Sequence, residues 1–283
     1  NSPIRESLNS LLVFSLCRNL EPMSDSLTDK SSELHAAIRL KPSDDLLRVH
    51  LFQLYAQEGK WQKALTQLQV AAQLSDTHKL LAQAYVLALR AESQREEVFK
   101  GVRSPKVLGE PRAWIEPLIA AMHKDADHEH AFACDLRAKA LLGAPPISGH
   151  VDDKGFEWIA DSDSRIGPVL EVVMNGVYCW APFDSIVEVK IDAPADLRDL
   201  VWIPAQLQLI HEGLQPVLLP VRYPIEEGVT ERSHLESRLT SWTQPAEGTW
   251  IGHGVKIFAT DSHEHSLLDC RHIRMDSPDS ADH

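Results

Sequence analysis

The 283 residues are 43% apolar and 24% charged, an ordinary globular composition whose length predicts about two domains. The formal net charge of −13 argues against a surface for nucleic-acid phosphates, because such surfaces need clustered lysine and arginine. The four cysteines form no C-x-x-C pair and no apolar run approaches the ~20 residues of a membrane span, so the sequence predicts a cytoplasmic protein with reduced thiols.

The two ends of the chain differ from the rest. Residues 8–17 are apolar like the core of a signal peptide, but polar residues interrupt the run and no small-residue cleavage site follows. We interpret residues 1–23 as a poorly ordered or non-native extension, with Met23 as the natural start. Residues 277–283 are predicted to form a solvated tail.

Residues 24–146 are predicted to form a tetratricopeptide-like helical domain. Ala37 recurs as Ala71, a shift of 34 residues that equals the period of this repeat. Gly59 stands where one helix must turn into the next, and glycine accepts the positive φ that such a turn requires. The repeat pattern is degenerate and covers about one and a half units.

Further helices are expected along the same half. Ser43 is predicted to cap a helix whose apolar stripe continues to Tyr55. A second helical pattern covers residues 78–100. Residues 114–142 are predicted to form one or two helices, with a break in the polar stretch at 124–130.

Residues 147–276 are predicted to form a β-rich domain. Asn175-Gly176 lies between two β-rich runs, 169–174 and 177–180, and indicates a type I′ hairpin because both turn residues tolerate positive φ. Residues 230–241 are expected to form a short helix or a loop. Further strands are expected at 185–191, 200–210, 215–223, 249–259 and 267–275. The predicted class is α+β, with a mainly antiparallel barrel-like or bent sheet after the helical domain.

Searches for catalytic and nucleotide-binding motifs find none of the common patterns. The turn that runs from Asp161 through Asp163 and Arg165 to Gly167 has the look of a calcium loop. However, an arginine occupies the fifth position and no glutamate stands at the twelfth. We therefore interpret this turn as a structural element or a recognition patch.

Two groups of histidines raise the alternative of a metal site. One group comprises His123, His128 and His130, and the other comprises His263, His265, Asp269 and His272. Imidazoles with a carboxylate can bind zinc, so a metal-assisted hydrolase that also uses Asp161 and Asp163 stays open as an alternative. Their spacing matches no recognised zinc pattern, which favours exposed histidines without a metal.

A second charged group follows a predicted strand. Asp196 and Asp199 flank Arg198 within four residues. Paired carboxylates can act as acid and base when burial separates their pKa values. With an arginine between them, a structural ion-pair network is the simpler interpretation.

Long stretches of the chain closely resemble the ImpE/TagJ family of type VI secretion accessory proteins. The resemblance covers roughly residues 30 to 275 and is far more specific than a short motif. The stretches that carry it are LLRVHLFQLYAQEGKWQKAL (46–65), VFKGVRSPKVLGEP (98–111), FEWIADSDSRIGPVLEVVMNG (156–176), VYCWAPFDSI (177–186), APADLRDLVWIPAQL (193–207) and LLPVRYP (218–224).

The resemblance implies a tetratricopeptide-like domain followed by a β-rich domain, with no enzymatic activity and no cofactor. It also implies binding to the N-terminal helix of the small sheath subunit, of the TssB/VipA type, and a link to the ClpV-type AAA+ ATPase that recycles the sheath. Such binding is helix-in-groove recognition. A tetratricopeptide-like scaffold for another client is a further alternative.

Binding anchors are expected to be few, apolar or aromatic, and central in the interface. The sequence offers candidates in both halves, and no catalytic or metal-binding residue is assigned. The partner-binding candidates are Phe52, Tyr55, Trp61, Trp158, Asp161, Asp163 and Arg165.

Overall fold

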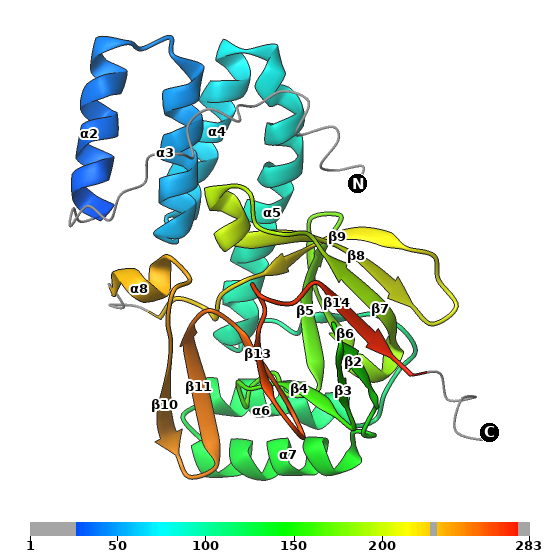
Figure 1. Ribbon diagram of the computed structural model, residues 1–283. Helices are drawn as coiled ribbons and strands as arrows, with labels where there is room; N and C mark the ends of the chain where they lie inside the picture. The colour runs from blue at the N-terminus through cyan, green and yellow to red at the C-terminus, as the bar shows by residue number, and fades with distance from the viewer. Residues whose placement is uncertain (1–26, 227–230, 277–283) are drawn as a thin grey trace.

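The computed structural model describes residues 27–226 and 231–276. One group of helices lies at one end of the molecule, and a sheet follows it (Figure 1). A second, shorter group of helices packs at the other end of the sheet. The extension predicted at 1–23 and the tail predicted at 277–283 lie outside the described residues.

The first helical group consists of antiparallel neighbours. A 3₁₀ turn, η2 (Asp76–His78), precedes its longest helix, and the expected helix over 78–100 is confirmed. Within the described ranges no helix combines the length and apolar composition needed to cross a membrane. The group comprises α2 (Leu27–Leu40), α3 (Asp45–Gln57), α4 (Trp61–Leu74) and α5 (Lys79–Phe99).

Two local signals place the α3–α4 hairpin. Gly59 has a φ of +69° between the helices, as the sequence predicts. The cap of α3 is Asp44 rather than Ser43, because the Asp44 carboxylate accepts from Leu47 N at 3.3 Å. Ala64 is fully buried and permits α4 to pack closely on α3.

The second helical group is split as expected. α6 (Ile115–Ala126) and α7 (His130–Gly143) are separated within the polar stretch that the sequence marked. His128 lies in this connection with a φ of 62°. The left-handed conformation ends α6 and lets α7 run back beside it.

The main sheet has nine strands in the order β1-β6-β5-β9-β8-β7-β14-β2-β3. All neighbours are antiparallel except β1 and β6, which are parallel. The order begins at β1 and ends at β3, so the sheet is open rather than a closed barrel. The α+β fold class is therefore confirmed. The strands are β1 (Lys106–Val107), β2 (Gly149–Val151), β3 (Lys154–Phe156), β5 (Val169–Met174), β6 (Val177–Pro182), β7 (Ile186–Ile191), β8 (Trp202–Leu209), β9 (Gln215–Pro220) and β14 (His272–Met275).

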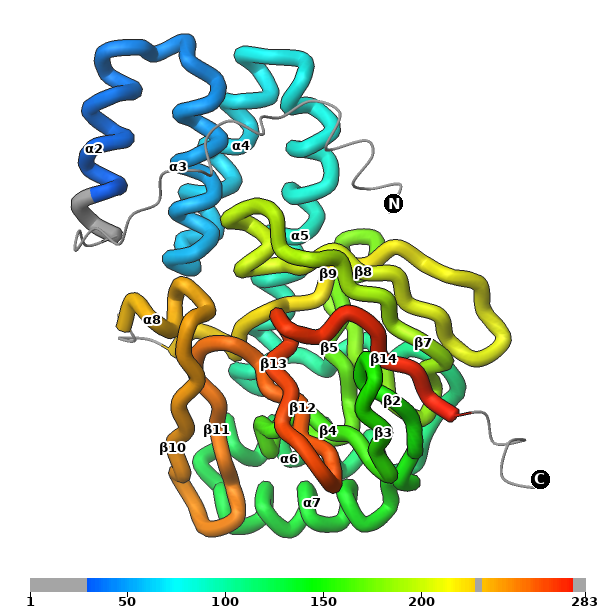
Figure 2. The backbone as a smooth tube through the Cα atoms, viewed as in Figure 1, coloured from blue at the N-terminus to red at the C-terminus, as the bar shows by residue number. Residues whose placement is uncertain are grey.

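Two smaller sheets complete the β region. In one of them β12 (Ile257–Thr260) lies between β13 (Glu264–Ser266) and β4 (Ile159–Asp161), and Figure 2 follows these strands as a tube. The other is a hairpin of β10 (Thr240–Ala246) and β11 (Thr249–Gly254). The short elements α8 (Arg232–Leu235), η3 (Phe183–Ser185) and η4 (Leu197–Leu200) connect strands.

The strand predicted over 249–259 is wrong as a single element. Gly254 has a φ of +87°, which ends β11 and directs the chain into β12 of another sheet. The strand predicted over 267–275 begins only at His272. The segment expected as a short helix or loop at 230–241 does contain α8, but its last residues already belong to β10.

The β5–β6 hairpin agrees with the sequence. Asn175 and Gly176 have φ values of 52° and 76°, as a type I′ turn requires. The hairpin also contacts α5, because the Gln94 amide donates to Gly176 O at 3.4 Å and accepts from Tyr178 N at 3.2 Å. A hairpin that forms locally is thus fixed against a helix of the first group.

The buried clusters cross the border between helices and sheet. Trp114 and Ile115 of the second helical group share one cluster with Val169 and Trp180 of the sheet. Trp202 of β8 belongs to the cluster of the first group. The domain boundary predicted at 147 stays a prediction, and the helices and the sheet are packed as one body around these residues.

Replacing Gly176 by alanine should destabilise the fold. Its φ is left-handed, and an added β-carbon would lie 2.8 Å from Leu87 Cδ2. We expect a loss of roughly 1–3 kcal/mol in the free energy of unfolding, measured by urea titration. Gly213→Ala is the control, because no atom lies within 4 Å of its added β-carbon. Equal stability of the two variants would contradict this account of the turn.

Candidate functional site at the junction of helices and sheet

A buried carboxylate, Glu171 on β5, is the centre of a charged network. Arg95 of α5 binds it with two hydrogen bonds, Nε to Oε1 at 2.6 Å and Nη2 to Oε2 at 3.1 Å. Lys256 contacts the same carboxylate and donates to Asp161 Oδ2 at 2.7 Å. Tyr178 OH donates to Glu171 Oε1 at 2.6 Å. One acid therefore receives two cations and a hydroxyl.

The two acids of this network have opposite pKa shifts. Burial alone would raise the pKa of Glu171, but Arg95 and Lys256 lower it to about 2. Burial raises the pKa of Asp161 to about 6, with Asp163 adding to the effect and Lys256 opposing it. Glu171 is thus firmly ionised, whereas Asp161 titrates near neutral pH.

The turn after β4 extends the network. Asp163 is fully buried and binds Arg165 through both oxygens, at 2.9 and 2.6 Å. Asp163 Oδ2 also accepts from Gly252 N at 3.0 Å, which ties the turn to β11. Asp161 accepts from Tyr223 OH at 3.0 Å. Side-chain and backbone groups already donate hydrogen bonds to the carboxylates of Asp161 and Asp163, so the geometry of the turn is that of a structural element.

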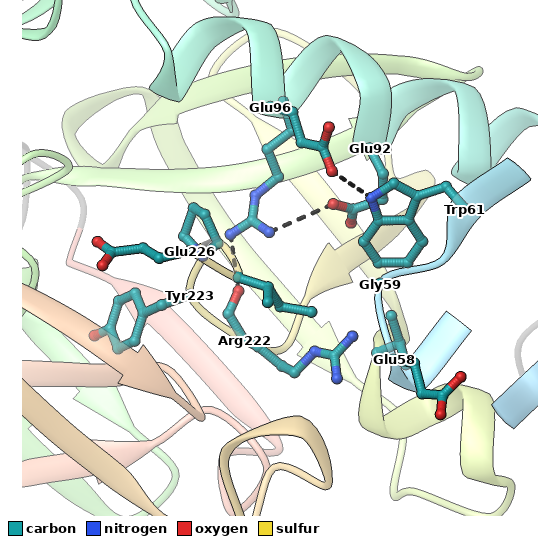
Figure 3. Close-up of a pocket in the computed structure, with 12 residues that line it drawn as sticks. Glu58, Gly59, Trp61, Glu92, Glu96, Arg222, Tyr223 and Glu226 are labelled. Atoms are coloured by element: carbon teal, nitrogen blue, oxygen red, sulfur yellow. Dashed lines mark hydrogen bonds and ion pairs between the residues drawn. The ribbon is translucent and has the colours of Figure 1, made fainter. Parts of the chain in front are cut away.

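A small pocket lies where α4 and α5 meet the segment after β9 (Figure 3). Its volume is about 170 Å³. Trp61 Nε1 donates to Glu96 at 2.6 Å across its wall. Behind it, Trp202 Nε1 donates to Glu92 at 2.7 Å. Carboxylates of α5 thus accept from indoles of both α4 and the sheet.

Arg222 closes this pocket from the sheet side. Its guanidinium donates to the carbonyl oxygens of Ala56 at 2.9 Å and Gln57 at 2.6 Å, and also to that of Leu235. Burial lowers the pKa of Arg222 to about 10. The C-terminal carbonyls of α3 carry the negative end of the helix dipole, so the arginine caps this helix from another part of the chain.

Comparison with known proteins gives a consistent result. The model of the ImpE protein family matches residues 153–274. The type VI secretion system accessory component TagJ of Pseudomonas aeruginosa is 39% identical over 256 residues, which cover 90% of this chain and 89% of the relative. The chain belongs to the ImpE/TagJ family. The resemblance found in the sequence is thereby confirmed.

The fold of this ImpE/TagJ protein also has a counterpart of known structure. The crystal structure of protein VPA1032 from Vibrio parahaemolyticus superimposes with a TM-score of 0.82. The match covers 89% of this chain and 94% of the other, at 21% identity. At this identity the likeness shows a shared fold alone.

The candidates on the helical side lie mainly in the core. Phe52 and Tyr55 are buried, and Phe52 packs edge-on against Tyr85 with ring centroids 5.9 Å apart. Trp61 is half-buried against Trp202, at 5.7 Å between centroids. Their role in partner binding stays a prediction.

The candidates on the sheet side fall into two groups. Asp161, Asp163 and Arg165 belong to the buried network described above. Trp158 is 40% exposed and lines a groove between the end of α7 and β4. Of the charged candidates, Asp161 also lines this groove, whereas Asp163 and Arg165 do not.

The second charged group caps η4. Asp196 is its N-cap, and Arg198 Nη2 lies 3.3 Å from the Asp196 carboxylate. Asp199 completes a capping box by accepting from Asp196 N at 3.0 Å. Gln53 of α3 donates to Asp196 at 2.6 Å, so this group also connects helix and sheet.

Sequence reasoning missed the central residues of the network, namely Glu171, Arg95, Lys256 and Arg222. One signal was present: Glu171 stands inside an otherwise apolar strand that is buried on both faces. Its partners were not identifiable, because Arg95 is 76 positions away.

Each histidine group has two neighbouring rings, His128 beside His130 and His263 beside His265, while His123 Nδ1 lies 2.7 Å from Gly101 O. In the register of the small sheet, Phe258 lies between Asp161 on β4 and His265 on β13. His272 contacts Glu188 at 2.9 Å. No group of three or more His, Cys, Asp or Glu side chains with metal-binding geometry occurs in residues 27–226 and 231–276.

Replacing Glu171 by glutamine should strongly destabilise the protein. The change leaves Arg95 and Lys256 buried beside a neutral group, which costs about 3–5 kcal/mol of unfolding free energy. The matched control is Glu97→Gln, whose exposed pair with Arg103 is worth less than about 1 kcal/mol. Chemical denaturation of both variants tests this, and similar losses would contradict a central role for Glu171.

Asp161 should give the stability a measurable pH dependence. Between pH 3.8 and about pH 6 the Asp161 carboxyl is protonated in the folded protein but ionised in the unfolded chain. This group therefore makes the free energy of unfolding fall as the pH rises. The full effect is roughly 3 kcal/mol. Glu171 has the opposite effect. Its contribution to the free energy of unfolding is complete above pH 4.5 and is lost as the pH falls towards about 2.

The pH test compares wild type with Asp161→Asn by urea titration at several pH values. The variant should lack the part of the decline between about pH 4 and 6 that Asp161 causes. Parallel curves for the two proteins would show that Asp161 titrates normally.

Proposed function

We propose that this protein is a non-enzymatic, cytoplasmic accessory protein of a type VI secretion system. It binds the N-terminal helix of the small sheath subunit, of the TssB/VipA type, and acts in ClpV-dependent recycling of the sheath. The observation that carries the proposal is the 39% identity, over 90% of the chain, to a relative whose name is type VI secretion system accessory component.

The pairing of two of the buried acids supports an adaptor rather than an enzyme. Asp163 is bound by Arg165, and Glu171 by Arg95 and Lys256. Groups so paired hold elements together and are poorly placed to exchange protons with a substrate. The helices and the sheet also share buried clusters, and a preorganised surface loses little entropy when it binds a partner segment.

The proposal is tested by titration with a synthetic peptide of the small sheath subunit's N-terminal helix from the same organism. Isothermal titration calorimetry with the full chain should show saturable binding, because an amphipathic helix buries its apolar face on a complementary groove. A peptide of the same composition in scrambled order is the control. Absence of heat at high micromolar peptide, with folded protein, would overturn the proposed function.

A further inference from the structure

The pocket where α4 and α5 meet the segment after β9 opens between the first helical group and the sheet (Figure 3). Its volume is about 170 Å³. A cavity of about 150 Å³ can hold a benzene molecule, so this pocket has room for roughly six to nine non-hydrogen atoms. That is the size of a small organic molecule, and a helix does not fit.

Two buried guanidinium groups that line the pocket each keep an N–H without an acceptor. The Arg95 side chain is 6% exposed, and its Nη1 has only a 3.5 Å contact with Glu92. Arg222 is 4% exposed, and its hydrogen bonds all use Nη1 and Nη2, which leaves Nε. Within the described ranges neither nitrogen is among the fully enclosed polar atoms that lack a partner, so both have surface open to the pocket.

Arg222 also lacks a counter-ion. Its hydrogen-bond acceptors are neutral carbonyl oxygens, and no carboxylate in residues 27–226 and 231–276 forms an ion pair with it. The dipole of α3 offsets only about half a unit charge. A buried cation without its own anion costs free energy. A carboxylate in the pocket would supply the charge, and its planar shape matches a guanidinium group.

The outer part of the pocket has the opposite preference. Glu96 and Glu226 line it beside the indole of Trp61. The Glu96 side chain is 44% exposed, and it keeps lone pairs for a further donor after it accepts from Trp61 Nε1. Carboxylates and an indole ring both attract an ammonium group. One end of the pocket therefore suits an anion and the other a cation.

The rest of the wall is apolar and is formed by Val201, Pro224 and Ile225. Ligands with a single kind of charge fit this combination poorly. A lysine or arginine side chain of a partner would suit the outer carboxylates but leave the N–H groups of Arg95 and Arg222 unpaired. Inorganic phosphate would suit the arginines but place its charges beside the glutamates of the same pocket.

We infer that this pocket binds a free α-amino acid with a small apolar side chain. Its carboxylate accepts from Arg95 Nη1 and Arg222 Nε, and its ammonium group lies at Glu96 and Trp61. The ligand contacts α4, α5 and the segment after β9 together, so it stabilises the junction of helices and sheet. This small-molecule site goes beyond the proposed adaptor function and does not depend on it.

The test is isothermal titration calorimetry of the full chain with L-alanine, L-valine and L-leucine. Two analogues of valine each lack one charge: 3-methylbutanoate lacks the ammonium group and 2-methylpropylamine lacks the carboxylate. We expect at least one amino acid, with valine the best match in size, to bind with a Kd at or below about 1 mM. Both analogues should bind about tenfold more weakly or worse, because each leaves one end of the pocket unpaired.

A matched pair of variants on α5 locates the site. Glu96→Gln removes a charge at the outer end of the pocket, and Glu97→Gln changes the next residue, which does not line it. The two side chains are 44% and 51% exposed. Glu96→Gln should weaken amino-acid binding by about fivefold or more, and Glu97→Gln should stay within about twofold of wild type. Ile225→Trp fills the pocket and should abolish binding, and thermal melting checks that each variant is folded.

Several results would overturn the inference. Absence of saturable heat with all three amino acids at about 10 mM would show that the pocket takes none of them. If either valine analogue binds as tightly as valine, the site recognises one charge only. If the folded Glu96→Gln and Ile225→Trp variants bind as wild type does, the amino acid binds elsewhere. None of these results bears on the sheath-subunit proposal, which is tested with a peptide.

Discussion

The ion pairs of Glu171 hold the helices on the sheet. The carboxylate belongs to β5, one of its cations to α5, and the other to the segment between β11 and β12. Burying three charges costs several kcal/mol per ion in desolvation, and the cost is met only if the geometry of all partners is good. The position of α5 against β5 is therefore strongly constrained. A shift that separates α5 from β5 breaks the Arg95–Glu171 pair and leaves Arg95 with only the 3.5 Å contact to Glu92 among its ion pairs.

The same principle extends outward from this centre. Arg95 also donates to the Arg222 carbonyl at 2.8 Å, and the Arg222 guanidinium then binds the last carbonyls of α3. Lys256 forms an ion pair with Asp161, and the turn that follows Asp161 is closed by the ion pair of Asp163 and Arg165. A chain of polar contacts thus runs from the first helical group through the sheet to β4. Directional bonds of this kind select one arrangement of the layers, whereas apolar packing alone tolerates several.

Local signals allowed much of the fold to be predicted, and long-range contacts account for what was missed. The Asn175-Gly176 turn and the helix break before α7 follow from φ preferences and polarity within a few residues. The division of residues 249–259 into two strands depends on Gly254, which has a φ of +87°. The sequence alone does not distinguish this glycine from glycines with a common φ. The site was harder to predict from the sequence, because its contacts join distant residues: Glu92 and Trp202 are 110 positions apart. Asp161 and Asp163 were recognised as a charged turn, but their partners Lys256 and Gly252 lie 95 and 89 positions further along the chain.

The buried network and the groove that Trp158 lines have Asp161 in common, so the network fixes one wall of this groove. Asp161 binds Lys256 inside the protein and also lines the groove. β4, which carries Asp161 and follows Trp158, is a short edge strand that pairs only with β12 in its sheet. Three residues of ladder would fix such a strand weakly. The buried ion pair and the Tyr223 hydrogen bond supply the missing constraint, so the charges in the core position the apolar side chain at the surface.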